Sequence, residues 1–455
     1  MEKNRVATGG IDMLSGGLYK NIFLFALPLI ASGMLQQSFN SVDMAVVGRF
    51  ADSMALAAVG SNGPVIGLIV NLFVGISLGA NVVIANYIGR GNESGIKKAV
   101  STAGALALIS GLLMMTVGLT VAEPILALLG TPDDVIDEAA GYLKIVSLGF
   151  PFMMIYNFSS AIMRSRGDTR SPFYALVAGG VVNVVLNLVL VIVFRMGVAG
   201  VALGTVAASI VSSAVLAWIL NRAEEPFRLN YLKVWATRSE VAKILQIGLP
   251  AGIQGVVFSI SNVFIQSAIN SFGSQAVAGS AAAINYEFYS YFIISAFVQA
   301  VVAFTGQNFG AGNYERCRRI FRVGMVYAVA MSLTLNAVVA LNKDFFISIF
   351  TSAPEVVEYA TIRITVVLIF QFVACSYEIA GASLRGIGYS MTPAVLTIFG
   401  TCVLRLLWVW ASANHFADFG LLMIIYPVTW TVTGIAVLIA FFRISRRVLP
   451  VKARK

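Results

Sequence analysis

Residues 89–98 of this chain spell GRGNESGIKK, and residues 310–319 spell GAGNYERCRR. Both stretches have the pattern Gly-x-Gly-Asn followed by a basic pair, Lys97-Lys98 in the first and Arg318-Arg319 in the second. The second stretch superimposes on the first without a gap when Gly310 is placed over Gly89. Internal similarity at a fixed spacing is the mark of a repeated structural unit. The chain is therefore expected to contain two similar halves.

The repeat extends well beyond these two stretches. Pro28 aligns with Pro250 in nearly the same register. The fourth loop of each half also matches, with Tyr156, Arg164, Gly167 and Pro172 in the first half aligned with Tyr377, Arg385, Gly388 and Pro393 in the second. The duplication thus covers most of each half.

The composition places the chain in a membrane. Of its 455 residues, 58% are hydrophobic and 11% are charged, which would leave large apolar patches exposed on a water-soluble protein. A helix needs about 20 apolar residues to cross the hydrocarbon layer. Twelve stretches reach this length, at about 20–47, 54–86, 97–121, 138–163, 171–194, 198–221, 243–269, 276–304, 320–341, 358–384, 392–413 and 420–443. We expect an all-α polytopic membrane protein of twelve transmembrane helices in two pseudo-symmetric six-helix lobes.

The short loops leave no room for a separate soluble domain. We expect an amino-terminal lobe over 1–221, a cytoplasmic linker over 222–242 and a carboxy-terminal lobe with a basic tail over 243–455. An even number of spans per half gives both halves the same orientation, related by an axis along the membrane normal. Lysines and arginines concentrate in alternate loops and in both termini, which predicts that both termini are cytoplasmic. The short loops and the lack of a cleavable signal peptide favour the plasma membrane of a prokaryote.

The sequence also resembles the multidrug and toxic compound extrusion (MATE) transporters over nearly its whole length. The resemblance rests on several short motifs: Val42-Asp43 with Val47-Gly48-Arg49, the two Gly-x-Gly-Asn segments, Leu384-Arg385-Gly386, and Asn183-x-x-x-Asn187. It implies twelve helices in a V-shaped pair of lobes. It also implies a secondary active exporter, working by alternating access as a monomer, that moves organic cations or amphipathic compounds against inward flow of protons or sodium ions.

Asp43 is the first candidate for ion coupling, because a carboxylate deep in an apolar helix costs roughly 2.5–3.5 kcal/mol and is rarely there without a role. Asn183 and Asn187 are one helical turn apart, so both amides lie on one face of the fifth span. The resemblance implies that these residues and Thr205 form a cation site. Asn187 stands where many members of the family have aspartate, which leaves Asp43 as the single charge. We expect no cofactor and no metal beyond a possible Na⁺ at Asp43, with H⁺ or Na⁺ as the coupling ion.

The second half offers different charged residues. Glu287, Glu378 and Arg405 are possible substrate or cation contacts, or they serve a structural role in which arginines neutralise the glutamates. Arg363 lies near the start of a predicted span, where its long side chain is expected to extend to the membrane surface.

A substrate cavity between the lobes should combine apolar and polar side chains. The candidates are Gln36, Gln37, Asn40, Tyr156, Gln254, Asn262, Tyr286, Tyr289 and Tyr377. No nucleotide-binding loop, catalytic triad or metal cluster is evident, so we expect no enzyme and no nucleic-acid partner; the partners are small molecules and the lipid bilayer. Two alternatives stay open: a flippase for a lipid-linked precursor, which would need several basic residues in the membrane, where we expect few arginines, and a non-transporting scaffold or receptor, which would not explain the repeat.

Overall fold

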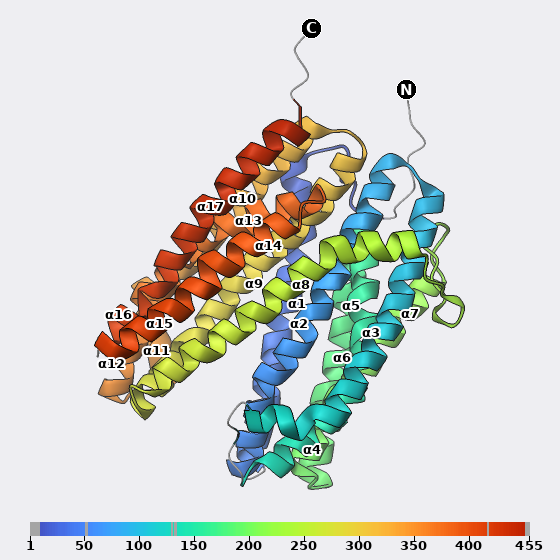
Figure 1. The fold of residues 1–455 in the computed structure, drawn as a ribbon. Helices are drawn as coiled ribbons and strands as arrows, with labels where there is room; N and C mark the ends of the chain where they lie inside the picture. The colour runs from blue at the N-terminus through green and yellow to red at the C-terminus, as the bar shows by residue number, and fades with distance from the viewer. Residues whose placement is uncertain (1–9, 51–52, 129–130, 132–133, 416–417, 451–455) are drawn as a thin grey trace. The chain divides into compact units, whose positions relative to one another are not determined.

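The computed structural model describes residues 10–50, 53–128, 131, 134–415 and 418–450, and these residues form helices and loops with no strand (Figure 1). Eleven of the described helical segments are long and apolar enough to cross a membrane. The number is twelve when α4 (Ile136–Ser147) and α5 (Phe150–Ser165), which bend by 49°, count as one span. The predicted all-α polytopic fold class is confirmed.

The remaining helices follow the predicted order. In the first half they are α1 (Leu18–Phe50), α2 (Ser53–Arg90), α3 (Glu93–Leu128), α6 (Arg170–Asn187) and α7 (Gly197–Asn221). In the second half they are α8 (Arg238–Asn270), α9 (Ser274–Gly310), α10 (Tyr314–Leu341), α11 (Lys343–Ser348), α12 (Pro354–Arg363), α13 (Cys375–Gly386), α14 (Met391–Thr397), α15 (Leu404–His415), α16 (Phe419–Met423) and α17 (Ile425–Val448). Shorter segments are π-helical, namely η1 (Leu188–Val193), η3 (Ile364–Leu368) and η5 (Ile398–Val403), or 3-10 helical, namely η2 (Tyr231–Lys233) and η4 (Ile369–Ala374).

The predicted span over 138–163 is broken between α4 and α5 rather than continuous. Pro151 lies in the first turn of α5, where the N–H that proline lacks would have no intrahelical partner. In a continuous helix the same proline would remove a hydrogen bond and clash with the preceding turn. The chain therefore restarts its helix after Gly149.

The chain divides into two compact units. Unit 1 consists of Ala31–Gly252 together with the segment that ends at Ile11, and unit 2 consists of Asp12–Ile30 and the chain from Ile253 onward. The boundaries fall inside α1 and α8, shortly after Pro28 and Pro250. The first turns of each of these helices thus belong to a different unit from the rest of the helix. The predicted lobes, divided at a linker over 222–242, describe the sequence repeat and stay a prediction.

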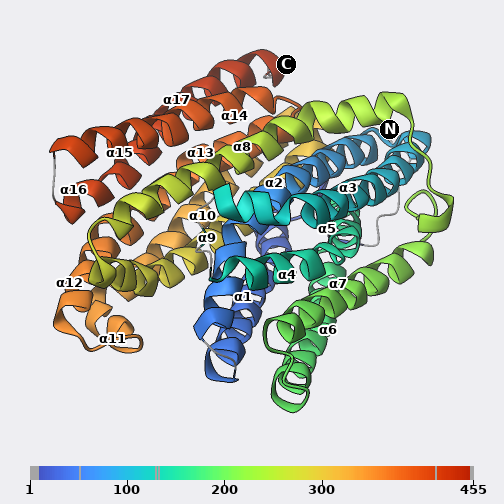
Figure 2. The ribbon, with the colours of Figure 1, turned by 60° about the horizontal axis from the view of Figure 1, so that its bottom comes forward.

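In unit 1, α3 packs against α2 and α5, and α6 packs along α7 (Figures 1 and 2). The first part of α8 meets α2 through glycines. A Cβ on Gly75 would lie 2.2 Å from the backbone nitrogen of Gly252, and one on Gly79 would lie 2.2 Å from the carbonyl oxygen of Ile244. Small residues four apart allow such close helix contact inside a membrane, where the hydrophobic effect cannot hold helices together.

The segment before α8 is packed on unit 1 by hydrogen bonds. The Ser101 hydroxyl donates to the carbonyl oxygen of Trp235 at 3.0 Å, and the Thr237 amide donates to Thr102 Oγ1 at 3.1 Å. The Tyr231 and Ser159 hydroxyls lie 2.7 Å apart. Burial raises the pKa of Tyr231 above its ordinary value, so its hydroxyl keeps its proton. The predicted linker therefore forms part of the packed surface of unit 1.

In unit 2, α9 packs against α10, α12 and α13, and α13 packs against α17 (Figure 1). The start of α1 is also attached to this unit. Asn308 Nδ2 donates to the carbonyl oxygen of Met13 at 2.9 Å, and Arg316 Nη2 donates to that of Ser15 at 2.8 Å. The rings of Phe25 and Phe304 pack edge to face at 5.5 Å. The preceding turn and the first half of α1 are thereby fixed to unit 2.

Candidate functional site

The candidate site of unit 1 begins with Asp43, which lies half-buried near the end of α1. Asn187 Nδ2 donates a hydrogen bond to Asp43 Oδ1. No basic side chain forms an ion pair with Asp43 among the residues that the structure describes. The carboxylate is thus stabilised by an amide rather than by a cation, which leaves a negative charge that a small cation or a proton can neutralise.

Asn183 and Asn187 are both buried on α6, as their spacing predicts. Asn187 Nδ2 lies 3.5 Å from Asn183 Oδ1, so the two amides adjoin. The Oδ1 atom of Asn187 is buried without a hydrogen-bond partner in the described part of the chain. Asn187 is also the last residue of α6 before the π-helical η1, a kind of helix irregularity that is frequent at functional sites. We call Asp43, Asn183 and Asn187 the Asp43 cluster.

Helix α7 closes the other side of this cluster. A Cβ on Gly204 would lie 2.1 Å from Asn187 Oδ1, so only glycine at this position lets the amide approach α7. Thr205, the next residue, donates its hydroxyl to the carbonyl oxygen of Val201 at 3.1 Å. The structure therefore brings the four predicted residues of the cation site into one region of unit 1.

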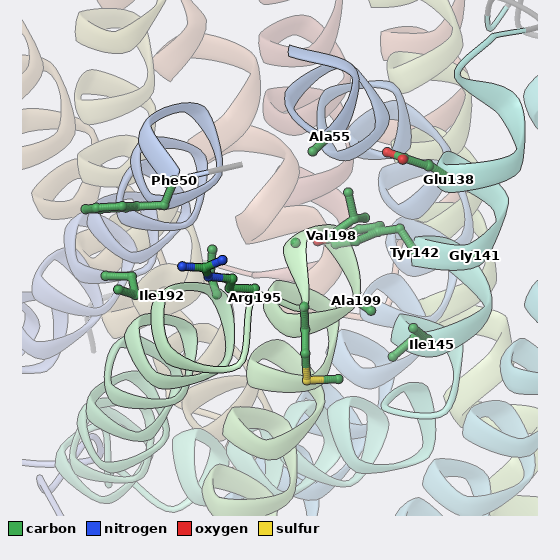
Figure 3. A pocket seen from close by; sticks show the side chains of 13 residues that line it. Phe50, Ala55, Glu138, Gly141, Tyr142, Ile145, Ile192, Arg195, Val198 and Ala199 are labelled. Carbon is green, nitrogen blue, oxygen red and sulfur yellow. The ribbon is translucent and has the colours of Figure 1, made fainter. Parts of the chain in front are cut away.

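Tyr142 is a further member of this region that the sequence did not single out. Its side chain is buried, interacts with the Thr205 hydroxyl and lies within electrostatic reach of Asp43. Tyr142 also lines a pocket of about 670 Å³ in which Glu138 and Arg195 lie on different sides (Figure 3). It thus borders both the pocket and the Asp43 cluster.

The donor set suits a hard monovalent cation or a proton. One carboxylate and the amide oxygens of two asparagines are oxygen ligands of the kind that such ions prefer. The described residues contain no group of three or more His, Cys, Asp or Glu side chains placed to bind a metal. A divalent ion at the Asp43 cluster would leave one positive charge uncompensated in a medium of low dielectric constant.

In unit 2 the charged residues predicted from the sequence form ion pairs and aromatic contacts. Glu287 of α9 accepts from Arg363 Nε at 2.6 Å and from Arg363 Nη2 at 3.1 Å. The prediction that Arg363 extends to the membrane surface is wrong, because its side chain is 1% exposed. The pairing with Glu287 compensates the cost of burying both charges.

Arg405 is equally buried but is held differently. Its Nε lies 3.4 Å from Thr429 Oγ1, and its guanidinium carbon lies 4.5 Å from the centre of the Tyr426 ring. Arg363 also lies over that ring, at 5.6 Å. We call Glu287, Arg363, Arg405 and Tyr426 the Arg405 cluster.

Glu378 is half-buried on α13, and Arg385 of the same helix is the basic group that acts on it electrostatically. Arg385 Nη2 donates to Gln254 Oε1 at 2.7 Å. Similarly, Asn262 Oδ1 lies 3.5 Å from Arg405 Nη1. Two predicted cavity residues, Gln254 and Asn262, therefore contact buried arginines of unit 2. Neither contact by itself assigns a substrate role.

The other cavity candidates are dispersed. Gln36 and Asn40 are exposed on α1 and Gln37 is half-buried there. The Tyr156 hydroxyl donates to the carbonyl oxygen of Pro172 at 3.2 Å, and that of Tyr286 donates to the carbonyl oxygen of Phe346 at 2.8 Å. The remaining two are the half-buried Tyr289 and the buried Tyr377. Tyr286 belongs to an apolar core, so its role in packing is evident.

Sequence reasoning overlooked Tyr142, Gly204 and the burial of Arg363. The repeat itself could have drawn attention to two of them, because the register that places Gly310 over Gly89 also places Arg363 over Tyr142. Gly204 gave no local signal, since its importance depends on how closely α6 approaches α7.

Comparison with known proteins agrees with this architecture. The MatE family model matches residues 28–189 and again residues 250–410, so the two matches follow the internal repeat. The chain is 28% identical to the probable multidrug resistance protein YoeA of Bacillus subtilis, over 84% of both chains. It is 27% identical to the probable multidrug resistance protein NorM of Thermotoga maritima, over 87% of this chain and 86% of the relative.

Solved structures show the same fold. A MOP superfamily transporter from Pyrococcus furiosus superimposes with a TM-score of 0.90 at 22% identity, covering 97% of this chain and 99% of the other. Because the family model matches most of the chain in two copies, the protein is a member of the MATE (multidrug and toxic compound extrusion) family of membrane transporters.

Proposed function

We propose that this protein is a secondary active multidrug exporter that couples the outward movement of small amphipathic or cationic compounds to the inward movement of H⁺ or Na⁺ at Asp43. The relatives named above as multidrug resistance proteins support the substrate class. The observation that supports the coupling role is the Asp43 cluster, in which an acid that has no basic partner among the described residues adjoins two buried amides.

The chemistry of the cluster accounts for reversible loading. When Asp43 is ionised, the Asn187 amide donates to it. When a cation or proton arrives, Oδ1 of Asn183 is an acceptor within the same cluster, and Oδ1 of Asn187, which lies against Gly204, becomes a second one when the amide turns over. A single charge moved across the membrane supplies about 2.3 kcal/mol per 100 mV, which can drive export without nucleotide hydrolysis.

Alternating access is the part of the proposal that rests on the repeat. Two similar halves in the same orientation can expose a site between them to either side by rocking against each other. Neutralisation of Asp43 would change whether the inward-open or the outward-open arrangement is favoured. A bound ion shifts the equilibrium between two such states by the difference in its affinity for them.

A flippase for a lipid-linked precursor is not favoured, since the named relatives are multidrug resistance proteins. The expectation that arginines within the membrane are few is a weaker argument against it. Unit 2 buries three of them, Arg363, Arg385 and Arg405, in the described part of the chain.

The test is efflux of ethidium from proteoliposomes under a sodium gradient or a proton gradient, each imposed alone. The parent protein should move ethidium under one of the two gradients. Asp43→Asn, which keeps the size of the side chain and removes its charge, should abolish that movement. Glu123→Gln is the matched control, because Glu123 is an exposed acid paired with Lys144 and should be dispensable.

Gradient-driven movement that survives in Asp43→Asn would refute the coupling role of Asp43. No movement by the folded parent protein under either gradient, combined with movement of a fluorescent lipid-linked substrate, would favour the flippase instead.

A further inference from the structure

Arg405 is a buried cation that has no acidic partner in the described part of the chain. Its side chain is 1% exposed, and no carboxylate oxygen forms an ion pair with it among the described residues. Its two hydrogen-bond contacts, to Thr429 at 3.4 Å and to Asn262 at 3.5 Å, are longer than ordinary N–H···O bonds. The Nη2 atom has no hydrogen-bond partner within the described ranges. Such a charge in a low-dielectric interior is costly unless something compensates it.

Neighbouring charges do not supply the compensation. In the described part of unit 2 three arginines are buried, Arg363, Arg385 and Arg405, and two glutamates lie on the same set of helices, the buried Glu287 and the half-buried Glu378. Glu287 is paired with Arg363, and Arg385 donates to Gln254 at 2.7 Å. The three arginines exceed the two glutamates by one positive charge, and Arg405 is the arginine with the longest hydrogen bonds. The excess corresponds to a single monovalent anion.

The repeat places this excess near the counterpart of the asparagine pair. The register that places Pro250 over Pro28 aligns Arg405 with Asn183, whereas the register that places Gly310 over Gly89 aligns Arg405 with Val184 and Tyr426 with Thr205. In these two registers Asp43 aligns with an apolar residue, Ile265 or Phe264. Among the described residues, the two halves thus differ in charge: unit 1 has an acid that lacks a base, and unit 2 has a base that lacks an acid.

The surroundings of Arg405 fit a planar ligand. The guanidinium lies over the Tyr426 ring at 4.5 Å and over the Phe258 ring at 5.4 Å. Arg363, which lies over the same Tyr426 ring, also has a buried nitrogen, Nη1, to which no described residue is hydrogen-bonded. A guanidinium binds a carboxylate through two parallel hydrogen bonds, and a monovalent carboxylate would bring the local charge to zero.

The guanidinium has one exposed neighbour on α8. Asn262, whose Oδ1 contacts Arg405 Nη1, is exposed, whereas Thr429, which contacts Nε, is fully buried. A ligand arriving beside Asn262 would have to displace the long hydrogen bond between Asn262 and Arg405.

We propose that Arg405 forms a binding site for a monovalent carboxylate in unit 2, between the Tyr426 and Phe258 rings and next to Asn262. The site would accept the carboxylate group of an amphipathic aromatic compound. It is independent of the proposed cation coupling at Asp43.

The test is thermal unfolding of the full-length protein in detergent with benzoate, benzamide or benzylamine at equal concentration and ionic strength. These probes share a ring and differ in charge. Benzoate at about ten times its dissociation constant should raise the unfolding midpoint by about 2–4 °C, and the other two should leave it unchanged. Equal shifts for benzoate and benzamide would overturn the proposal, because they would indicate binding through the ring alone.

Variants locate the site. Arg405→Gln should abolish the benzoate shift while folding normally, since it removes an uncompensated buried charge. Arg405→Lys, which keeps the charge and loses the planar fork, should weaken benzoate binding about tenfold. Arg443→Gln, at an exposed arginine near the end of α17, is the matched control and should keep the full shift. A benzoate shift that persists in Arg405→Gln would refute the site.

Asp43→Asn separates this inference from the proposed function. It should lose gradient-driven efflux and keep the benzoate shift. If efflux proves independent of Asp43 while benzoate binding depends on Arg405, the proposed coupling fails and the carboxylate site stands.

Discussion

Asp43 in unit 1 and Glu287 in unit 2 are both acids set among apolar helices, but their surroundings differ. Asp43 is half-buried and is bonded to an amide, whereas Glu287 is 9% exposed and is bonded to a guanidinium through two hydrogen bonds. An acid that must bind and release a cation has to remain without a fixed partner. An acid that neutralises a buried arginine has to be held permanently.

This contrast teaches that burial of an acid does not by itself indicate ion coupling. The partner decides the role. In unit 1 the partner of Asp43 is a neutral amide, which a cation or a proton can replace. In unit 2 the partner of Glu287 is itself a cation, the guanidinium of Arg363. The two halves of a duplicated fold can therefore hold their acids differently, in an exchangeable site in one half and in a permanent ion pair in the other.

The largest expected effect follows from breaking the Glu287–Arg363 pair. Glu287→Gln leaves Arg363 charged and buried, which should lower the free energy of unfolding by about 3–5 kcal/mol. Asp43→Asn removes a charge that has no basic partner among the described residues and should leave stability nearly unchanged. Thermal or denaturant unfolding of the full-length protein compares the two.

A second substitution shows whether the stability lost in Glu287→Gln is due to the unpaired charge of Arg363. Adding Arg363→Met to Glu287→Gln removes that charge and should restore most of the lost stability. If Glu287→Gln alone were as stable as the parent protein, the ion pair would not be the reason for the difference between the units.

An intermediate effect is expected at Gly204. A methyl group there would come within 2.1 Å of Asn187 Oδ1, so Gly204→Ala should displace the amide and cost about 1–3 kcal/mol of stability. Coupled efflux should fall with it, because the Asp43 cluster loses its geometry. The matched control is Gly67→Ala on α2, where a Cβ would meet no described atom within 4 Å. Equal efflux by the two variants would show that the position of Asn187 is unimportant.

Much of the fold could be predicted from the sequence because its signals are long and local. Hydropathy located each span, and the repeat of Gly-x-Gly-Asn and of Pro28 with Pro250 identified the duplication, which the two family matches reproduce. The bend before Pro151 and the unit boundaries inside α1 and α8 could not be predicted in this way. Hydropathy reports that a segment is apolar, and it does not report which neighbours the segment packs against.

The candidate sites also differ in how much of each could be predicted from the sequence. Asp43 and the asparagine pair could be selected because a polar residue in an apolar helix is conspicuous, and the structure brings them together. Arg363 was misinterpreted because its partner, Glu287, lies far away in the sequence, on another helix. Arginine near the end of an apolar stretch usually extends to the membrane surface, and only the tertiary structure shows the carboxylate that keeps it buried.

The smallest effect is expected at Thr205, and it tests how far the Asp43 cluster extends. Its hydroxyl donates to the carbonyl oxygen of Val201 within its own helix, so Thr205→Val should change the free energy of unfolding by no more than about 1 kcal/mol. If the Thr205 oxygen also helps to bind the coupling ion, Thr205→Val should raise the ion concentration needed for half-maximal efflux, while Thr205→Ser should not. An unchanged ion dependence in Thr205→Val would restrict the cation site to Asp43 and the two amides, because a ligand oxygen cannot be removed without loss of affinity for the ion.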